Sequence, residues 1–188
     1  KTKQKASGGP ITKDNTSVEY YCTIFAIAES PLNENILWTG SDDGLIHLSK
    51  DGGKNWRNVT PFSFPKNTMV NCIEADPFNE GTCYIAATSY KLGDFSPYLY
   101  KTVDYGANWT KIVTGISNEH FTRAIRADRE EKGILYSGTE QGMYISYNYG
   151  QQWYPLQLNL PITPITDITL KDQSLIVSTQ GRGIWMID

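Results

Sequence analysis

Short runs of apolar, β-branched and aromatic residues alternate along the chain with clusters of Pro, Asn, Asp and Gly. Such runs are typical of β-strands, and such clusters are typical of the turns between them. No stretch keeps the 3.6-residue period of an amphipathic helix. The pattern therefore predicts an all-β fold. The expected strands cover 22–28, 36–40, 44–49, 70–75, 83–88, 98–102, 122–127, 134–139, 143–147, 165–170, 175–179 and 183–187.

An eight-residue pattern, Ser/Thr-x-Asp/Asn-x-Gly-x-polar-Trp, occurs three times, at 49–56, 102–109 and 146–153. An Asp or Asn side chain can accept hydrogen bonds from nearby backbone N–H groups, and Gly permits a tight turn. The Trp opens the next strand and supplies a large ring for burial. We therefore expect a structural role for the residues that define the pattern. These are Ser49, Asp51, Gly53, Trp56, Thr102, Asp104, Gly106, Trp109, Ser146, Asn148, Gly150 and Trp153.

Three expected strands precede each of these turns, and a fourth follows each Trp, at 56–60, 109–113 and 153–156. Four antiparallel strands in a repeat of about 45 residues describe one blade of a β-propeller. The sequence predicts complete blades over 19–62, 68–116 and 120–158, and a partial fourth blade with three strands over 163–188.

Residues 1–18 are rich in Lys, Thr, Ser and Gly, which predicts an irregular leader before the blades of 19–188. Propellers close into a ring to hide their strand edges. We therefore expect the chain to form the C-terminal part of a larger propeller. A four-bladed ring and a self-paired dimer are the alternatives.

The repeated pattern resembles the Asp-box, or bacterial neuraminidase repeat, of sialidases, xyloglucanase-type glycoside hydrolases and sortilin-type propellers. Segments 7–16, 38–47, 98–106 and 179–188 extend the resemblance to large secreted bacterial proteins with sortilin-like, glycosyl-hydrolase-like repeats. The resemblance implies a secreted, periplasmic or cell-envelope protein in which this stretch closes a propeller. The chain departs from the sialidase pattern, because it has no Arg-Ile-Pro signature and only five arginines. A complete sialidase site is therefore not expected.

Composition excludes several classes of protein. The 17 basic and 20 acidic residues give a net charge of −3, which argues against a nucleic-acid partner. No apolar run reaches the length of a membrane span. Cys22, Cys72 and Cys83 lack metal-site spacing, so we expect buried thiols, no metal site and no cofactor.

Any ligand site is expected on the propeller face opposite the repeated turns, where the loops into first strands and between second and third strands meet. Aromatic, basic and polar side chains in these loops are the ligand-binding candidates: Tyr21, Tyr90, Lys91, Phe95, His120, Arg123 and Arg182. The segment 90–97 is the longest of these loops, and Arg123 is expected to pair with Asp167 in the channel.

Glycosidases need two carboxylates about 5 to 9.5 Å apart. The candidates here are Asp42, Asp43, Asp94, Glu140 and Asp167, and their separations do not follow from the sequence. The leading hypothesis is a non-catalytic propeller module that binds a peptide, protein or glycan. The alternatives are part of a glycoside hydrolase, sialidase-like or xyloglucanase-like, and a purely structural segment.

Overall fold

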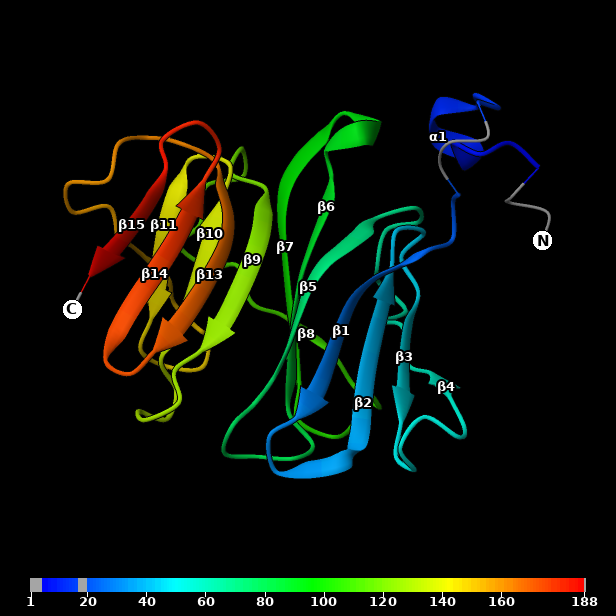
Figure 1. Ribbon diagram of the computed structural model, residues 1–188, viewed down its shortest axis with the longest axis horizontal. Coiled ribbons are helices and arrows are strands. Elements are labelled where there is room, and N and C mark those ends of the chain that lie inside the picture. The colour runs from blue at the N-terminus through cyan, green and yellow to red at the C-terminus, as the bar shows by residue number, and fades with distance from the viewer. Residues whose placement is uncertain (1–4, 17–19, 188) are drawn as a thin grey trace.

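The computed structural model describes residues 5–16 and 20–187, which form four antiparallel sheets. Figure 1 shows the sheets standing side by side, and neighbours in space are also neighbours in sequence. The fold is therefore the predicted all-β propeller architecture, with three four-stranded blades and a three-stranded fourth blade.

The strands of blade 1 are β1 (Ile24–Ser30), β2 (Asn33–Ser41), β3 (Ile46–Ser49) and β4 (Arg57–Asn58). The strands of blade 2 are β5 (Met69–Ala75), β6 (Cys83–Ser89), β7 (Asp94–Thr102) and β8 (Thr110–Lys111). Those of blade 3 are β9 (Thr122–Ala127), β10 (Leu135–Thr139), β11 (Gly142–Ser146) and β12 (Tyr154–Pro155), and those of blade 4 are β13 (Ile165–Lys171), β14 (Ser174–Thr179) and β15 (Ile184–Ile187).

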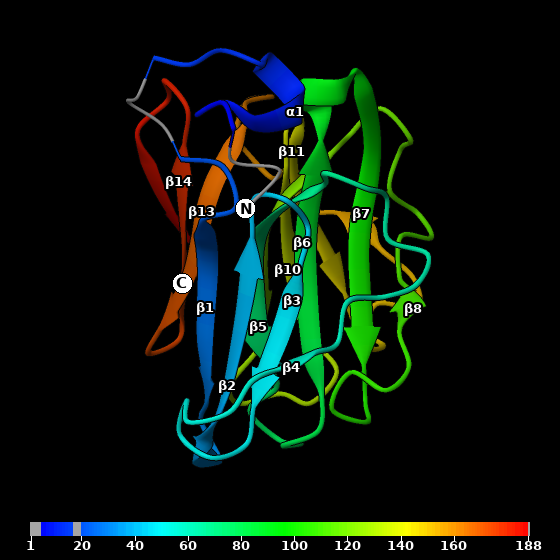
Figure 2. The same cartoon turned by 90° about the vertical axis from the view of Figure 1, so that its right-hand side faces the viewer.

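The first strand of each blade lies against the first strand of the next, so the first strands line the centre of the propeller. In Figure 2, β1 and β13 lie on one side of the molecule and β7 and β8 on the other. Each first strand also carries an irregularity at the same place. Phe25, Asn71, Arg123 and Thr166 have no partner in the register of their strand pairs. Such a β-bulge re-aims the side chain that it contains.

The core lies in the seams between blades. Ile73, Ile125 and Ile168 hold the same register position in β5, β9 and β13, and their exposed fractions are 5%, 0% and 1%. Each packs on the preceding blade. Ile27 holds this position in β1 and is 68% exposed. Within the described residues, blade 1 therefore exposes to solvent the face that the other blades bury against a preceding blade.

The three repeated turns, 49–56, 102–109 and 146–153, have one hydrogen-bond pattern, and we call them the repeat turns. The Ser49 hydroxyl donates to Asp51 at 2.8 Å, and the Asn55 backbone N–H donates to the same carboxylate at 2.8 Å. Asp104 and Asn148 accept the equivalent bonds in the other turns. The hydrogen bonds from Asn55 lower the pKa of Asp51 to about 2. This chemistry holds a turn, as the sequence predicts.

The turn tryptophans connect adjacent blades. The indole N–H of Trp109 in blade 2 donates to the Val59 carbonyl of blade 1 at 2.7 Å, and Trp153 in blade 3 donates to Ile112 of blade 2 at 2.7 Å. Trp56 has no preceding blade among the described residues. Its indole N–H donates within its own turn, to Gly53, and its side chain is 42% exposed.

Four expectations need correction. The leader contains a one-turn helix, α1 (Gly9–Thr12), rather than irregular chain throughout, because the fixed φ of Pro10 suits a first helical turn. The fourth strands are two residues long rather than four or five. The expected loop 90–97 is shorter, because a 3₁₀ turn over Tyr90–Leu92 ends at Gly93 and β7 begins at Asp94. Cys72 and Cys83 are buried, but Cys22 is half-buried in the loop before β1.

In residues 5–16 and 20–187, no helix has the length and apolar character of a membrane span.

Candidate ligand-binding face

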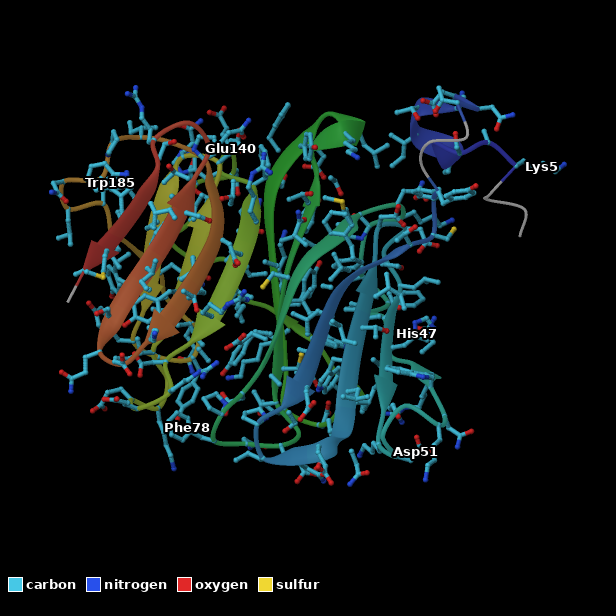
Figure 3. All side chains as sticks on the ribbon, viewed as in Figure 1. Lys5, His47, Asp51, Phe78, Glu140 and Trp185 are labelled. Atoms are coloured by element: carbon cyan, nitrogen blue, oxygen red, sulfur yellow. The ribbon has the colours of Figure 1, made fainter. Side chains whose placement is uncertain are left out.

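The loops between second and third strands gather at one end of the blades, together with the segments that enter the first strands. We call this end the loop face. In Figure 3, Glu140 marks the loop face at the top, and Asp51 of a repeat turn lies at the bottom. Blade topology therefore separates the candidate ligand residues from the repeat turns, as the sequence reasoning expects.

An aromatic cluster on the loop face joins blades 2 and 3. The rings of Tyr90 and Phe121 stack with centroids 5.2 Å apart and an interplanar angle of 14°. Phe95 lies 6.1 Å from Phe121 and is 51% exposed, whereas Phe121 is buried. The Arg123 guanidinium lies 5.1 Å from the Phe121 ring centroid and 5.7 Å from that of Tyr90. Three sequence-predicted residues, Tyr90, Phe95 and Arg123, are therefore brought together by Phe121, which the sequence reasoning did not single out.

A carboxylate fixes the guanidinium in this cluster. Arg123 Nη2 lies 2.7 Å from Glu140 Oε2, and Nε donates to the same oxygen at 2.8 Å. The expected pairing of Arg123 with Asp167 is wrong. Arg123 is the bulge residue of β9, and the bulge turns its side chain toward the β10–β11 loop that carries Glu140. Asp167 pairs instead with Arg126, Oδ1 to Nη2, at 2.9 Å.

His120 and Arg182 lie apart from the described contacts of the aromatic cluster. His120 Nδ1 is 2.8 Å from the Tyr144 hydroxyl, and the two rings meet edge to face. This interaction links the segment before β9 to β11 within blade 3. Arg182 lies in the exposed hairpin between β14 and β15, where its backbone carbonyl accepts the Trp185 indole N–H.

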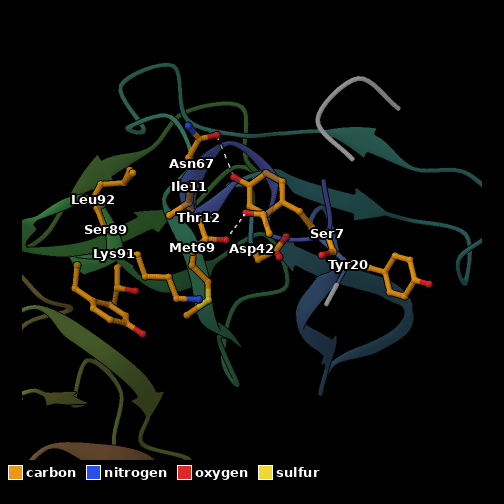
Figure 4. A pocket seen from close by; sticks show the side chains of 14 residues that line it. Ser7, Ile11, Thr12, Tyr20, Asp42, Asn67, Met69, Ser89, Lys91 and Leu92 are labelled. Carbon is orange, nitrogen blue, oxygen red and sulfur yellow. Dashed lines mark hydrogen bonds between the residues drawn. The ribbon is translucent and has the colours of Figure 1, made fainter. Parts of the chain in front are cut away.

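A small pocket lies beside the leader, between blades 1 and 2 (Figure 4). Its volume of about 60 Å³ has room for a few waters. Tyr21 donates its hydroxyl hydrogen to Asn67 at 3.0 Å, and Lys91 also lines the pocket. Burial raises the pKa of Tyr21 to about 12 and raises the pKa of Asp42.

The leader covers Tyr21 closely. The Tyr21 backbone N–H donates to Ser7 at 3.0 Å, and a Cβ on Gly9 would lie 2.4 Å from the Tyr21 ring. Tyr21 is consequently only 6% exposed. Of the predicted ligand-binding residues, Tyr21 is the one that the leader shields from solvent.

Every candidate acidic residue has an internal partner. Asp42 accepts from the Thr23 N–H at 2.9 Å, and Asp43 accepts from the Ser41 hydroxyl at 2.5 Å. Asp94 accepts from the Tyr98 hydroxyl at 2.5 Å, which contributes to a lowered pKa although burial acts in the opposite direction. Glu140 and Asp167 are held by the arginines described above. All five carboxylates are therefore engaged in internal contacts of the fold.

Charged residues of three first strands form a cluster, and the sequence reasoning, which placed Arg126 and Asp167 on first strands, did not predict their pairing. Arg126 of β9 lies between Glu74 of β5, with 3.7 Å from Nη1 to Oε2, and Asp167 of β13, and it also contacts Cys72. Burial raises the pKa of Glu74 to about 7, although Arg126 acts in the opposite direction. The repeat contains the signal for this cluster, because Glu74 and Arg126 hold the same register position in successive first strands.

Comparisons with curated proteins find partial relatives. The chain is 33% identical over 88 residues to a probable oligoxyloglucan-reducing end-specific xyloglucanase of Neosartorya fischeri, which covers 46% of this chain and 10% of that protein. It is 28% identical over 88 residues to an oligoxyloglucan-reducing end-specific xyloglucanase of Emericella nidulans, with the same coverage. The chain therefore matches only about a tenth of the length of these relatives. No family model matches the chain.

Solved structures with the same fold are β-propellers. YCF48 bound to D1 peptide has a TM-score of 0.66 at 17% identity, covering 89% of this chain and 52% of that chain. The Xanthomonas campestris GH74 xyloglucanase has a TM-score of 0.65 at 14% identity, covering 87% and 29%. The Cps50 (Swd1) propeller domain of Myceliophteria thermophila has a TM-score of 0.65 at 18% identity, covering 87% and 53%. These similarities establish the β-propeller fold of this chain, which matches about half or less of each of these propellers.

Proposed function

We propose that the chain is a non-catalytic propeller module that binds a peptide, protein or glycan on its loop face. The observation that carries this proposal is the aromatic cluster of Tyr90, Phe95, Phe121 and Arg123. Phe95 offers an exposed ring, and the ion pair with Glu140 holds the guanidinium against the aromatic rings. Aromatic faces next to an oriented guanidinium suit sugar rings, peptide side chains and backbone carbonyls.

The internal contacts of the candidate carboxylates support binding rather than catalysis. A glycosidase acid and its partner must face each other across the scissile bond, about 5 to 9.5 Å apart. Here Glu140 is bound to Arg123, Asp94 to Tyr98, and Asp167 to Arg126. YCF48, a propeller of the same fold, is seen with a peptide, which is a second support for a binding role.

Glycoside hydrolysis is the second candidate, and the similarity to the Neosartorya fischeri xyloglucanase favours it. In that case this chain contributes part of a site whose other residues lie outside 5–187. Incubation of xyloglucan oligosaccharides with the complete protein that carries these blades tests this, because the chain alone would lack part of the site. New reducing ends, measured against a boiled control, would replace the binding proposal with the enzymatic one.

The binding proposal is tested on peptide and glycan arrays, followed by affinity measurement of the strongest binder with matched variants. Phe95→Ala removes the exposed ring of the cluster. Phe62→Ala removes an exposed ring in the segment between β4 and β5. We expect Phe95→Ala to weaken binding by about tenfold or more and Phe62→Ala to leave it unchanged. Equal effects of the two variants on affinity would show that the aromatic cluster is not the binding site.

We also infer that the repeat turns are Asp-boxes, as in sortilin-like proteins, and that further blades of the same propeller cover the exposed face of blade 1. The common hydrogen bonds of the three turns and the exposed Ile27 support these inferences. A secreted, periplasmic or cell-envelope location follows from the resemblance. Fractionation of the native cells with an antibody to the chain tests this location.

A further inference from the structure

The small pocket beside the leader contains two buried hydroxyl groups that no protein group satisfies. Ser7 of the leader and Thr88 of β6 both line this pocket, and they are 8% and 2% exposed. Neither hydroxyl oxygen has a hydrogen-bond partner among the described residues. Buried hydroxyls without partners are rare and costly, so two of them around one pocket indicate a site for a polar ligand.

A third unsatisfied group, the ammonium of Lys91, belongs to the same pocket. In Figure 4 the Lys91 side chain extends from the connection between β6 and β7 into the pocket. Its ammonium has no hydrogen-bond or ion-pair partner in residues 5–16 and 20–187. An ammonium can only donate hydrogen bonds, and a hydroxyl can donate one. The three unsatisfied groups therefore share a need for an acceptor, and the positive charge of Lys91 favours an anionic one.

The acidic residue of the pocket limits the charge of that anion. Asp42 lines the pocket and accepts a hydrogen bond from the Thr23 backbone N–H at 2.9 Å. Its negative charge repels a second anion, and the repulsion grows with the charge of the ligand. Burial raises the pKa of Asp42, which lessens this repulsion. A singly charged carboxylate is therefore a better match than a doubly charged phosphate.

The size and the apolar wall of the pocket limit the shape of the ligand. The volume of about 60 Å³ corresponds to about four waters. Ile11, Met69 and Leu92 add apolar groups to the lining. A carboxylate at the end of a short methylene chain fits this space, with its carbon atoms on the apolar wall. The carboxylate of a sugar acid is bonded directly to a bulky ring, which is too large to enter.

The pocket adjoins the aromatic cluster of the loop face. Tyr90 lines the pocket and also stacks on Phe121, with ring centroids 5.2 Å apart. The Ser7 side of the pocket is fixed, because the Ser7 carbonyl accepts the Tyr21 backbone N–H at 3.0 Å. A ligand with one group in the pocket can therefore continue across Tyr90 to the cluster.

We propose that this pocket, which we call the Lys91 pocket, is a carboxylate subsite of the loop face that takes the side chain of an acidic residue in a peptide ligand. The Lys91 ammonium and the hydroxyls of Ser7 and Thr88 donate to the carboxylate oxygens, and the peptide continues over Tyr90. The inference rests on the proposed function, of which it selects the peptide form. The Lys91 pocket can nevertheless be tested without a ligand of the aromatic cluster.

Propionate provides the first test, because it is a carboxylate on a short methylene chain. The ¹⁵N-labelled full chain is titrated with sodium propionate, at an ionic strength held constant with sodium chloride, and the amide shifts are recorded. We expect saturable shift changes at Tyr21, Thr88 and Lys91. Inorganic phosphate and glucuronate are titrated in the same way, and we expect neither to saturate these shifts over the same concentration range. Saturation by either of them, or no saturation by propionate, would overturn the proposal.

Three variants of the protein locate the carboxylate. Lys91→Met removes the ammonium, and Lys66→Met is the matched control, because Lys66 is exposed beside Asn67 but does not line the pocket. We expect Lys91→Met to weaken propionate binding by about tenfold or more and Lys66→Met to leave it unchanged. Thr88→Val removes a hydroxyl at nearly constant shape, and we expect it to weaken propionate binding by about threefold or more.

The stability of Thr88→Val separates a binding role from a structural one. The hydroxyl that this variant removes has no partner in the described part of the chain, so we expect the free energy of unfolding in urea to stay the same or to rise. Reduced stability with unchanged propionate binding would show a structural hydroxyl. Unchanged propionate binding in Lys91→Met would likewise overturn the proposal.

A pair of peptides tests the class of ligand. We expect acetyl-Gly-Glu-Gly-amide to bind the full chain at least about tenfold more tightly than acetyl-Gly-Gln-Gly-amide. Equal affinities would overturn the choice of an acidic peptide. An array ligand that Phe95→Ala weakens and Lys91→Met does not would overturn this inference alone. Binding of propionate and of the Glu peptide, with no array ligand that depends on Phe95, would overturn the proposed role of the aromatic cluster alone.

Discussion

Replacement of Trp153 by Ala tests whether the turn tryptophans hold the blades together. Trp153 is 1% exposed, packs with Tyr84, and donates to the Ile112 carbonyl at 2.7 Å. Loss of a buried Trp side chain costs about 3 to 5 kcal/mol, and the orphaned carbonyl adds about 1 kcal/mol. We therefore expect Trp153→Ala to lower the free energy of unfolding by about 4 to 6 kcal/mol, a large part of the ~5 to 15 kcal/mol of a typical domain.

Trp56→Ala is the matched control, because Trp56 occupies the same turn position in blade 1. It is 42% exposed and its indole donates only within its own turn. We expect this variant to cost about 1 to 2 kcal/mol, in proportion to the smaller area that it buries. Urea unfolding followed by far-ultraviolet circular dichroism gives both values, with unchanged m-values as the sign that the unfolding reaction is the same. Equal losses in the two variants would refute the seam role of Trp153.

Further predictions concern the turn glycines and the inner cluster. Gly150 and Gly181 both have a φ near +80°, but a Cβ would meet Ile112 only at Gly150, so Gly150→Ala should destabilise the chain by about 1 to 3 kcal/mol more than Gly181→Ala in the same urea assay. Similar losses would contradict the close contact. Glu74 has a folded-state pKa of about 7, above its unfolded value, so the unfolded chain loses this proton first and stability falls as pH rises from about 4.5 to 7. Glu74→Gln should flatten the pH profile of unfolding in that window by up to about 3 kcal/mol, and an unchanged profile would show that Glu74 ionises normally.

The fold could be predicted from local chemistry because it repeats. Each turn is specified by residues within eight positions, such as Ser49, Asp51 and Trp56, whose side chains bond to their own turn. The strand pattern places the core, since Ile73, Ile125 and Ile168 fill equivalent seams. The hydrogen-bond partner of each turn tryptophan could not be predicted, because the Val59 and Ile112 carbonyls belong to the preceding blade.

The sequence predicted the face of the propeller on which the candidate residues lie, but it did not predict the contacts between them. Topology alone places Tyr90, Phe95 and Arg123 in loops at one end of the blades. The pairing of Arg123 with Glu140 depends on the β9 bulge, which shifts the alternation of side chains by one residue and has no signature in the strand composition. The burial of Tyr21 depends on the leader folding back across the loop face, which the polar composition of residues 1–18 does not indicate.

The central claim, that the loop face binds a ligand without transforming it, is tested most directly by nuclear magnetic resonance. The ¹⁵N-labelled chain is titrated with the strongest array binder, while the ligand signals are recorded in the same tube. We predict shift changes centred on Tyr90, Phe95, Phe121 and Arg123, with ligand signals that remain those of the intact molecule. Shift changes centred on the repeat turns, or the appearance of cleaved ligand, would contradict the account.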